Sequence, residues 1–292
     1  MRRIIVLKLI LVAFIFMQCN QPGIIDVKNA RHKAAKKRTL PKTVGYHFEN
    51  YREWVKNNKN SDKEPIVLAV NRTDNNNIAK MDSIIVPNDL TGDKESYLPF
   101  PFKVGAIEEI EKIIFFSYST QTFGAYEFGD LIYSGPVNMG RKNDPTPSGL
   151  YFTNWKAEKT TSTFNDEWDL RWNVNIENKL GIGWHQYELP GYPASHSCLR
   201  LQEKDARLLY DWAEQWIMDD KEIVKAQGTP VIVFGRYDFD APKPWLQLTN
   251  DPHALDITRS ALTEELKPFL AEIMAQRKRR AAAIEHDNKN GK

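Results

Sequence analysis

Short apolar runs separated by polar turns dominate the middle of the chain and predict β-strands. The runs at residues 113–118, 122–128 and 131–133 are rich in β-branched and aromatic side chains, and a Gly-Asp pair between the last two is a hairpin signal. A further strand-like run at 229–235 closes this part of the chain. The pattern indicates several short strands joined by tight turns.

A single helical pattern interrupts these strands. Apolar residues recur every four positions between residues 208 and 217 and would form one stripe on a helix. Many short strands with one packed helix are typical of a β-sandwich or a partly open barrel. We therefore predict a mainly β domain with one packed helix at residues 101–238.

The segments on either side of this domain have other patterns. Aromatic residues between 46 and 54 predict a short helix, and two apolar runs within residues 65–89 flank a polar turn. We expect a small α/β N-terminal extension at 46–100. Its sequence MDSIIVP weakly resembles the end of a LysM wall-binding module, although a packed extension with no binding role fits the residues equally well. Residues 239–292 are expected to be a peripheral segment with a helix at 259–284 and a basic, polar tail.

The beginning of the chain has the layout of an export signal. Two arginines precede a short apolar run at residues 9–17, and Cys19 follows closely. The run is too short to span a bilayer stably, which takes about 20 apolar residues. A cysteine in this place resembles the lipobox of bacterial lipoproteins, whose cysteine becomes the acylated N-terminus. The resemblance implies a signal peptide at 1–18, lipidation of Cys19 and a tether at 19–45; a conventionally cleaved secreted protein and a retained anchor are the alternatives.

Composition and charge limit the classes of function. The chain has 292 residues and a formal net charge of +2, which is close to neutral for its length. The basic runs at 31–38 and 277–280 lack the interleaved aromatic side chains of a base-stacking surface. We therefore predict no nucleic-acid partner and expect both runs to be solvated.

The two cysteines have different expected fates. If Cys19 is lipidated, Cys198 has no partner for an intramolecular disulfide. A free cysteine is either buried as a small apolar side chain or used chemically. Of the six histidines, only His185 and His196 lie within 13 residues of Cys198. Glycines and prolines between them predict a loop that could return His185 to the thiol, and at this point a structural and a catalytic role both stay open.

Four separated motifs resemble one family. The sequence PASHSCLRL around Cys198, with His185 ahead of it, resembles the active-site motif of the L,D-transpeptidases, the YkuD-type enzymes of bacterial cell walls. SGPVNMGRKNDPTPSGLYF at 134–152 is similar to the strand and turn that precede this site in the family. LRLQEKDARLLYDWA and GTPVIVFG are similar to the family's helix after the cysteine and to its last strand. The resemblance covers residues 110–236 and implies a YkuD-like fold for the predicted β domain.

The resemblance also implies a role for each residue of the motif. Cys198 would be the nucleophile and His185 its general base. Ser195 and His196 would shape the site and steady the thiolate. Arg200 would hold the loop or a substrate carboxylate, since a guanidinium pairs well with carboxylates.

Ser197 is the one departure from the family motif, which has glycine there. The backbone N–H groups of Ser197 and Cys198 are the expected oxyanion donors. If this position requires a positive φ, serine costs about 1 kcal/mol relative to glycine. If φ is negative, the hydroxymethyl group only narrows the pocket.

The resemblance implies action on peptidoglycan stem peptides. Cys198 would attack the bond before the terminal D-alanine of a tetrapeptide and form a thioester. An amine from a neighbouring stem would then complete a cross-link, whereas water would make the protein an L,D-carboxypeptidase. A third possibility is a wall-binding lipoprotein that has lost catalysis through Ser197.

Two further expectations concern cofactors and location. No cofactor and no metal are expected, because the histidines have no carboxylates or cysteines at ligand spacing. We expect a lipid-anchored membrane protein of the cell envelope that faces the periplasm. Asn20 directly after Cys19 favours the outer over the inner membrane.

Overall fold

The computed structural model describes residues 37–161 and 169–289. The expected signal peptide, Cys19 and most of the tether lie outside these ranges. Within the described residues, no helix is both long and apolar enough to cross a membrane.

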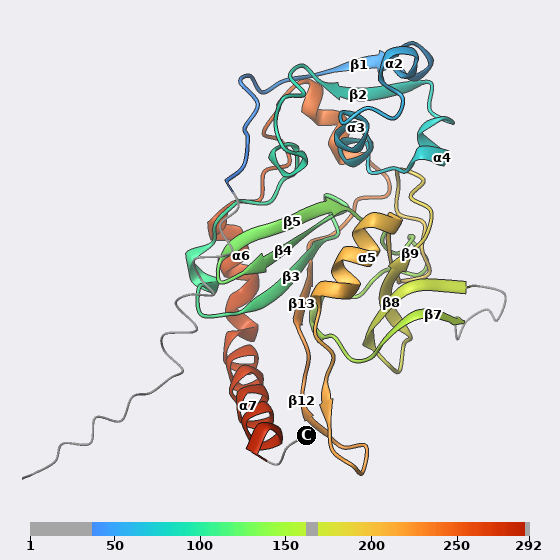
Figure 1. The fold of residues 1–292 in the computed structure, drawn as a ribbon. Helices are drawn as coiled ribbons and strands as arrows, with labels where there is room; N and C mark the ends of the chain where they lie inside the picture. The colour runs from blue at the N-terminus through green and yellow to red at the C-terminus, as the bar shows by residue number, and fades with distance from the viewer. Residues whose placement is uncertain (1–36, 162–168, 290–292) are drawn as a thin grey trace, which may run out of the picture.

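Two β-sheets form the centre of the molecule (Figure 1). The larger sheet has the strand order β5-β4-β3-β13-β6, and β13 runs parallel to β3. Its strands are β3 (Lys112–Ser117), β4 (Thr122–Glu127), β5 (Asp130–Pro136), β6 (Gly149–Phe152) and β13 (Pro230–Phe234). The smaller sheet has the order β10-β9-β8-β7, and its strands are β7 (Lys156–Thr161), β8 (Asp169–Glu177), β9 (Ile182–Gln186) and β10 (Leu199–Leu201). The predicted mainly β architecture is confirmed.

Strand β3 shows why the central strands are apolar on both faces. Ile114 and Phe116 belong to the core shared with the smaller sheet, which includes Trp184 of β9. Phe115 points to the opposite face and belongs to a second core, which includes Leu262 from the C-terminal part of the chain. Successive side chains of a strand face opposite sides, so a sheet that is covered on both sides needs continuous apolar strands.

Helix α5 (Glu203–Trp212) is the predicted packed helix, but it lies several residues earlier than expected. We predicted that the apolar stripe would continue to residue 217. Instead the chain turns extended at Ala213, and Ile217 belongs to the short strand β11 (Ile217–Met218). The ammonium of Lys156 on β7 donates to the backbone oxygens of Tyr210 and Ala213 at 2.7 and 2.8 Å. A cation that binds the last carbonyls of a helix satisfies them and favours termination there.

Residues 46–87 form a small unit that we call the N-terminal module. Strands β1 (Tyr46–Asn50) and β2 (Ser83–Pro87) pair antiparallel. The helices between them are α2 (Tyr51–Asn58), α3 (Glu64–Val70) and α4 (Asn75–Ile78). The helix that we predicted at 46–54 is wrong in its first half, because the chain stays a strand up to Asn50. There the Asn50 side chain accepts hydrogen bonds from the backbone N–H groups of Arg52 and Glu53 and starts α2.

The C-terminal segment is less peripheral than the sequence suggested. Trp245 is buried in a core with residues of the N-terminal module, and Leu262 and Ile273 pack on the larger sheet. The predicted helix at 259–284 is present as two helices, interrupted where Pro268 occurs. The remaining elements are η1 (Lys94–Tyr97), η2 (Gly105–Ile107), β12 (Val224–Ala226), η3 (Pro244–Thr249), α6 (Arg259–Leu266), η4 (Lys267–Phe269) and α7 (Leu270–Lys289).

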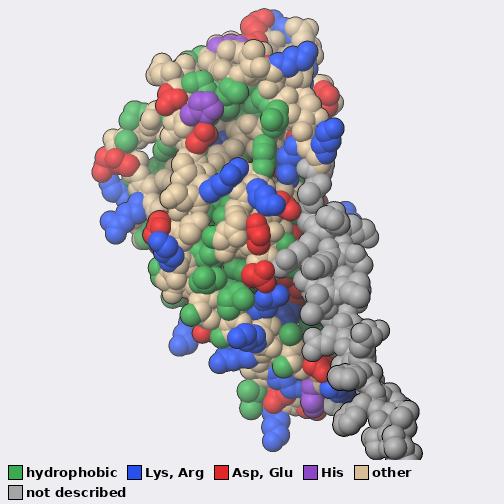
Figure 2. All heavy atoms as spheres, turned by 90° about the vertical axis from the view of Figure 1, so that its left-hand side faces the viewer, with side chains coloured by type: hydrophobic (Ala, Val, Ile, Leu, Met, Phe, Trp, Pro, Cys, Tyr) green, Lys and Arg blue, Asp and Glu red, His purple; other side chains and the backbone are tan. Residues whose placement is uncertain are grey.

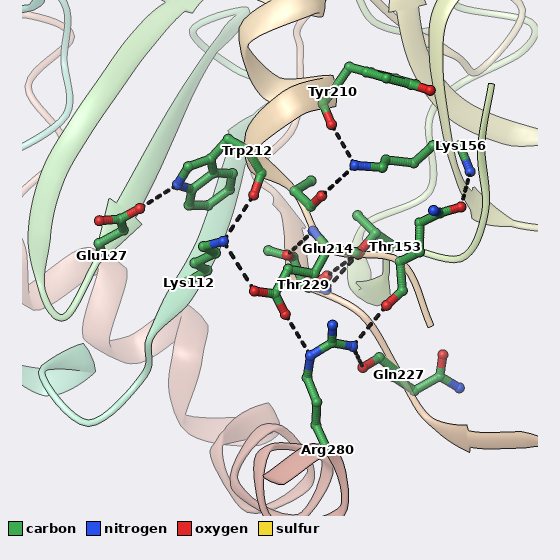
Figure 3. A network of polar contacts seen from close by, with 12 residues as sticks. Lys112, Glu127, Thr153, Lys156, Tyr210, Trp212, Glu214, Gln227, Thr229 and Arg280 are labelled. Atoms are coloured by element: carbon green, nitrogen blue, oxygen red, sulfur yellow. Dashed lines mark hydrogen bonds and ion pairs between the residues drawn. The ribbon is translucent and has the colours of Figure 1, made fainter. Parts of the chain in front are cut away.

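A polar network fastens α7 to the β domain (Figure 3). The Nε atom of Arg280 lies 2.5 Å from one carboxylate oxygen of Glu214, and the Nζ atom of Lys112 lies 3.1 Å from the other. Arg280 also donates to the backbone oxygens of Gln215 and Gln227. On the face shown in Figure 2, basic and acidic side chains are interspersed, as the small net charge leads one to expect.

Candidate active site

A cavity of about 250 Å³ opens on the smaller sheet and contains most of the predicted site residues. His185, His196, Cys198 and Arg200 all line it. The rest of its wall comes from β7, β8, their connections and the residue after β9: Trp155, Thr160, Thr161, Leu170, Asn173, Asn175, Asn178, Gly181 and Tyr187. Two side chains predicted to be a base and a nucleophile therefore face one solvent-accessible space.

Parallel pairing of β9 and β10 brings His185 and Cys198 to the wall of one cavity. In this register Arg200 lies opposite His185 and Leu199 lies opposite Trp184. Cys198 directly precedes β10, so the loop of residues 187–198 leaves β9 after the histidine and returns at the cysteine. We call residues 187–198 the catalytic loop.

The His185 imidazole is buried and held by the main chain. Its Nδ1 atom lies 3.0 Å from the backbone oxygen of Gln186. A carbonyl oxygen only accepts, so Nδ1 carries the proton in this contact and Nε2 is left as the acceptor nitrogen. Burial lowers the pKa of His185 to about 4; the Gln186 contact opposes this shift and the charge of Arg200 adds to it. The imidazole is therefore neutral at neutral pH and can accept a proton.

The Cys198 thiol is protonated in the resting structure. Burial raises its pKa, while the backbone N–H of Gly183 and the charge of Arg200 act in the opposite direction. The sulfur lies 3.6 Å from the backbone oxygen of Gly181, which a thiol can reach as a weak donor. Cys198 and His185 thus rest as a neutral pair, and the thiolate forms only when the proton leaves.

Gly183 is required by the close approach of β9 to β8. A Cβ atom at this position would lie 2.4 Å from the backbone oxygen of Val174. Only glycine tolerates such an approach without a shift of the main chain. Glycine here lets the strand place its N–H beside the thiol.

Ser197 adopts the left-handed conformation, with φ at 78°. The first of the two conformations considered for this position is therefore the observed one, and serine carries the strain that glycine would avoid. The strain is partly offset, because the Ser197 hydroxyl lies 3.2 Å from the backbone oxygens of both Asp144 and Pro145. Thr146 donates from Oγ1 to the Ser197 carbonyl at 2.8 Å and holds the turn from the other side.

The side chains of Ser195, His196 and Arg200 occupy different places around the thiol. Ser195 is buried, and its hydroxyl donates to the backbone oxygen of Cys198 at 2.6 Å. His196 lies on the cavity wall. The Arg200 guanidinium stacks over the Tyr187 ring at 4.4 Å. Within residues 37–161 and 169–289 no carboxylate lies at ion-pair distance from it, although the charge of Glu188 acts on it. Its charge is thus available to an anionic group in the cavity.

Several groups at the site were not expected from the sequence. The Gln186 carbonyl and the Gly183 N–H are backbone groups, whose positions depend on the fold and not on side-chain identity. Thr146 lies in the TPSG turn that carried part of the family resemblance, but its contact with Ser197 had no sequence signal. Tyr187 follows His185 by two positions, and an aromatic residue so close to a candidate base could have been singled out.

Comparison with known proteins identifies the domain that carries this site. Residues 111–233 match the family model of the YkuD L,D-transpeptidase catalytic domain. This confirms the resemblance that the motifs indicated for residues 110–236. No curated protein gave a match.

Solved L,D-transpeptidase structures are also similar to part of the chain. One from Stackebrandtia nassauensis is 24% identical, with 44% of this chain and 57% of that chain covered and a TM-score of 0.35. One from Mycobacterium tuberculosis H37Rv is 22% identical, with 43% and 58% covered and a TM-score of 0.34. A third, in complex with imipenem, is 19% identical, with 42% and 59% covered and a TM-score of 0.34. The chain spans less than two thirds of the length of each of these proteins.

Proposed function

We propose, from the premise that residues 111–233 are a YkuD-type L,D-transpeptidase catalytic domain, that the protein cross-links peptidoglycan stem peptides through a thioester on Cys198. The observation that carries this proposal is the shared cavity: His185 faces it from β9, and Cys198 faces it from the residue before β10, the parallel neighbour of β9. The Gln186 carbonyl fixes the tautomer of His185 in which Nε2 accepts a proton. A nucleophile, a base and a group that orients the base are the parts that covalent acyl transfer needs.

The first half of the reaction forms the thioester. The Cys198 proton moves to Nε2 of His185 as sulfur attacks the carbonyl carbon before the terminal D-alanine. The carbon–nitrogen bond then breaks, the imidazolium returns its proton to the leaving amine, and D-alanine departs. Burial disfavours both the thiolate and the imidazolium, so the resting pair is neutral and the proton must reach His185 for the attack to proceed.

The second half releases the enzyme. An amine of a neighbouring stem attacks the thioester and gives a proton to His185. The carbon–sulfur bond breaks, and the proton passes back to the sulfur of Cys198. Arg200 is the proposed partner of a substrate carboxylate, since its charge faces the cavity without a protein carboxylate.

The backbone N–H groups of Ser197 and Cys198 remain the proposed oxyanion donors. The left-handed turn at Ser197 is supported by hydrogen bonds on both sides, from Thr146 and to Asp144 and Pro145. This support favours an active enzyme over a wall-binding protein that lost catalysis through this serine. Water in place of the acceptor amine would give an L,D-carboxypeptidase with the same residues.

We further propose that Cys19 carries a lipid and anchors the protein in the envelope, on the outer membrane. The export signal and the cysteine that follows it support this proposal. Fractionation of cells that express a Cys19→Ser variant tests the anchor. Protein that stays in the membrane fraction after this change would refute lipidation of Cys19.

The activity is tested with the purified full chain and tetrapeptide muropeptides. Mass spectrometry should show loss of D-alanine, together with cross-linked dimers for a transpeptidase or tripeptides for a carboxypeptidase. Imipenem, which is bound in one of the similar structures, should acylate Cys198. The Cys198→Ala variant should do neither. Absence of both D-alanine release and acylation in the unchanged protein would overturn the proposal.

A further inference from the structure

We propose that Thr73 and Asp74 of the N-terminal module are positioning residues that hold the catalytic loop in its reactive shape. This inference rests on the proposed function for its consequence in catalysis. The sequence left the role of residues 46–100 open between wall binding and simple packing. The contacts at the end of α3 assign the module a part in building the active site.

Two adjacent side chains bind both backbone groups of one residue in the catalytic loop. The Thr73 hydroxyl donates to the backbone oxygen of Leu189 at 2.9 Å. The Leu189 N–H donates to the Asp74 carboxylate at 2.6 Å. Leu189 is buried, so without these partners its N–H and C=O would be unsatisfied away from water. The β domain depends on the module for these two hydrogen bonds.

The same segment also reaches the chain beyond the nucleophile. The Gln202 side chain, directly after β10, donates to the backbone oxygen of Thr73 at 2.7 Å. Thr73 additionally forms a β-bridge with Pro190 in the catalytic loop. Thr73 therefore contacts the chain both after His185 and after Cys198, and it fixes the spacing of the two ends of the loop.

Thr73 and Asp74 can position the loop because they are themselves fixed. Asp74 accepts hydrogen bonds from the N–H groups of Asn76 and Asn77 and so caps α4. Arg72 is buried, and its guanidinium donates to the backbone oxygens of Ala69 and Val70 at the end of α3. The contacts on the catalytic loop thus come from a segment between α3 and α4 that is itself held by hydrogen bonds to both helices.

Arg72 begins a second series of hydrogen bonds, which runs from the module toward Cys198. Its Nε atom donates to the backbone oxygen of Thr120 at 2.7 Å, in the turn between β3 and β4. In that turn, the side-chain oxygen of Gln121 accepts the N–H of Met139 at 2.8 Å. The Met139 carbonyl in turn accepts the N–H groups of Ala194 and Ser195, each at 3.1 Å. Both ends of the catalytic loop are therefore supported from the module.

The test uses a Thr73→Val variant of the full chain, which removes the hydroxyl and keeps the shape. The rate of Cys198 acylation by imipenem should fall by about fivefold, because one lost hydrogen bond of roughly 1 kcal/mol loosens the loop. Hydrogen exchange of the Leu189 amide should become faster by a similar factor. The conservative Thr73→Ser variant should restore both values, since it returns the hydroxyl.

Thr91→Val is the matched control, because the Thr91 hydroxyl bonds Asp89 near the module and does not reach the catalytic loop. It should leave acylation and Leu189 exchange within twofold of the unchanged protein. A second measurement follows iodoacetamide alkylation, mapped to the Cys198 peptide, across pH. Thr73→Val should shift this pH profile, whereas Thr91→Val should not.

The outcomes separate the two proposals. If the unchanged protein is not acylated, the proposed function fails, yet the exchange and alkylation measurements still decide the positioning role. If Thr73→Val matches the control in acylation, Leu189 exchange and alkylation profile, the positioning role is refuted. A fall in acylation that Thr73→Ser does not restore would also refute it.

Discussion

The N-terminal module and helix α7 both pack on the β domain, but they touch it in different ways. The module contacts the β domain through hydrogen bonds of Arg72, Thr73 and Asp74. Their partners lie in the catalytic loop and in the turn at Thr120. Helix α7 packs Ile273 on the face of the larger sheet that carries Phe115, runs alongside β12, and is fastened there by Arg280 (Figure 1, Figure 3). Among the residues that the structure describes, the hydrogen-bond and ion-pair partners of Arg280 are Glu214, Gln215 and Gln227, and none of these lines the cavity.

This difference separates stability from catalytic geometry. A contact that covers an apolar face stabilises the folded state wherever it lies. A contact that fixes the loop between a base and a nucleophile also sets the distance over which a proton must move. We therefore expect changes in the module to affect both stability and rate, and changes in α7 to affect stability alone.

The largest expected effect is that of Arg72→Met. The change leaves the backbone oxygens of Thr120, Ala69 and Val70 without their guanidinium partner in a buried place. We expect a loss of about 3 kcal/mol in the free energy of unfolding, measured with urea. The acylation rate of the protein that remains folded should also fall. A loss of stability with an unchanged acylation rate would show that the module does not contribute to the geometry of the active site.

Acid should destabilise the protein through His185, which lies in the β domain and belongs to neither flanking region. Its pKa is about 4 in the folded protein, whereas an unperturbed histidine has 6.5. As pH falls below 6.5 the unfolded chain binds a proton that the folded protein does not, so stability is lost between pH 6.5 and pH 4. From pH 7 to pH 5 the loss should be about 2 kcal/mol.

The His185→Gln variant isolates this loss. Between pH 7 and pH 5, the free energy of unfolding of this variant should fall by about 2 kcal/mol less than that of the unchanged protein. The Arg280→Met variant should keep the full loss. An equal pH dependence with and without the imidazole would show that His185 is not buried in its neutral form.

Arg280→Met should have a smaller effect, confined to stability. The pKa of Glu214 is lowered, because Arg280 and Lys112 together outweigh the burial that raises it. Removal of Arg280 leaves Glu214 with Lys112 alone at a half-buried site, at an expected cost of about 1 to 2 kcal/mol. Acylation by imipenem should proceed at the normal rate. A slower rate in fully folded variant protein would mean that α7 also contributes to the site.

The smallest effects are expected at Ser197. Glycine would relieve the positive φ but lose the hydroxyl contacts with Asp144 and Pro145, so Ser197→Gly should change stability by less than about 1 kcal/mol. Alanine keeps the strain and loses the contacts, so Ser197→Ala should destabilise by about 1 kcal/mol. Thermal unfolding of both variants gives the comparison. A glycine variant less stable than the alanine variant would contradict the account of this turn.

The sequence was informative where side-chain type and local spacing carry the structure. The apolar runs located β3, β4, β5 and β13, and the motif drew attention to His185 and Cys198, which the structure puts on the wall of one cavity. The helix end at Trp212 was missed, because it depends on Lys156 from another strand. Thr73 and Asp74 were missed for the same reason: Leu189 lies 116 and 115 residues away in the chain. Contacts between backbone groups and distant side chains leave no periodic signal.

The neutral resting pair has a consequence for the lifetime of the nucleophile. Peroxides and other thiol oxidants react with the thiolate, and a protonated thiol is a poor target for them. Burial raises the pKa of Cys198, and the structure gives this cysteine no disulfide partner within residues 37–161 and 169–289. Burial therefore keeps the thiolate fraction of Cys198 low, which slows attack by oxidants on the proposed nucleophile.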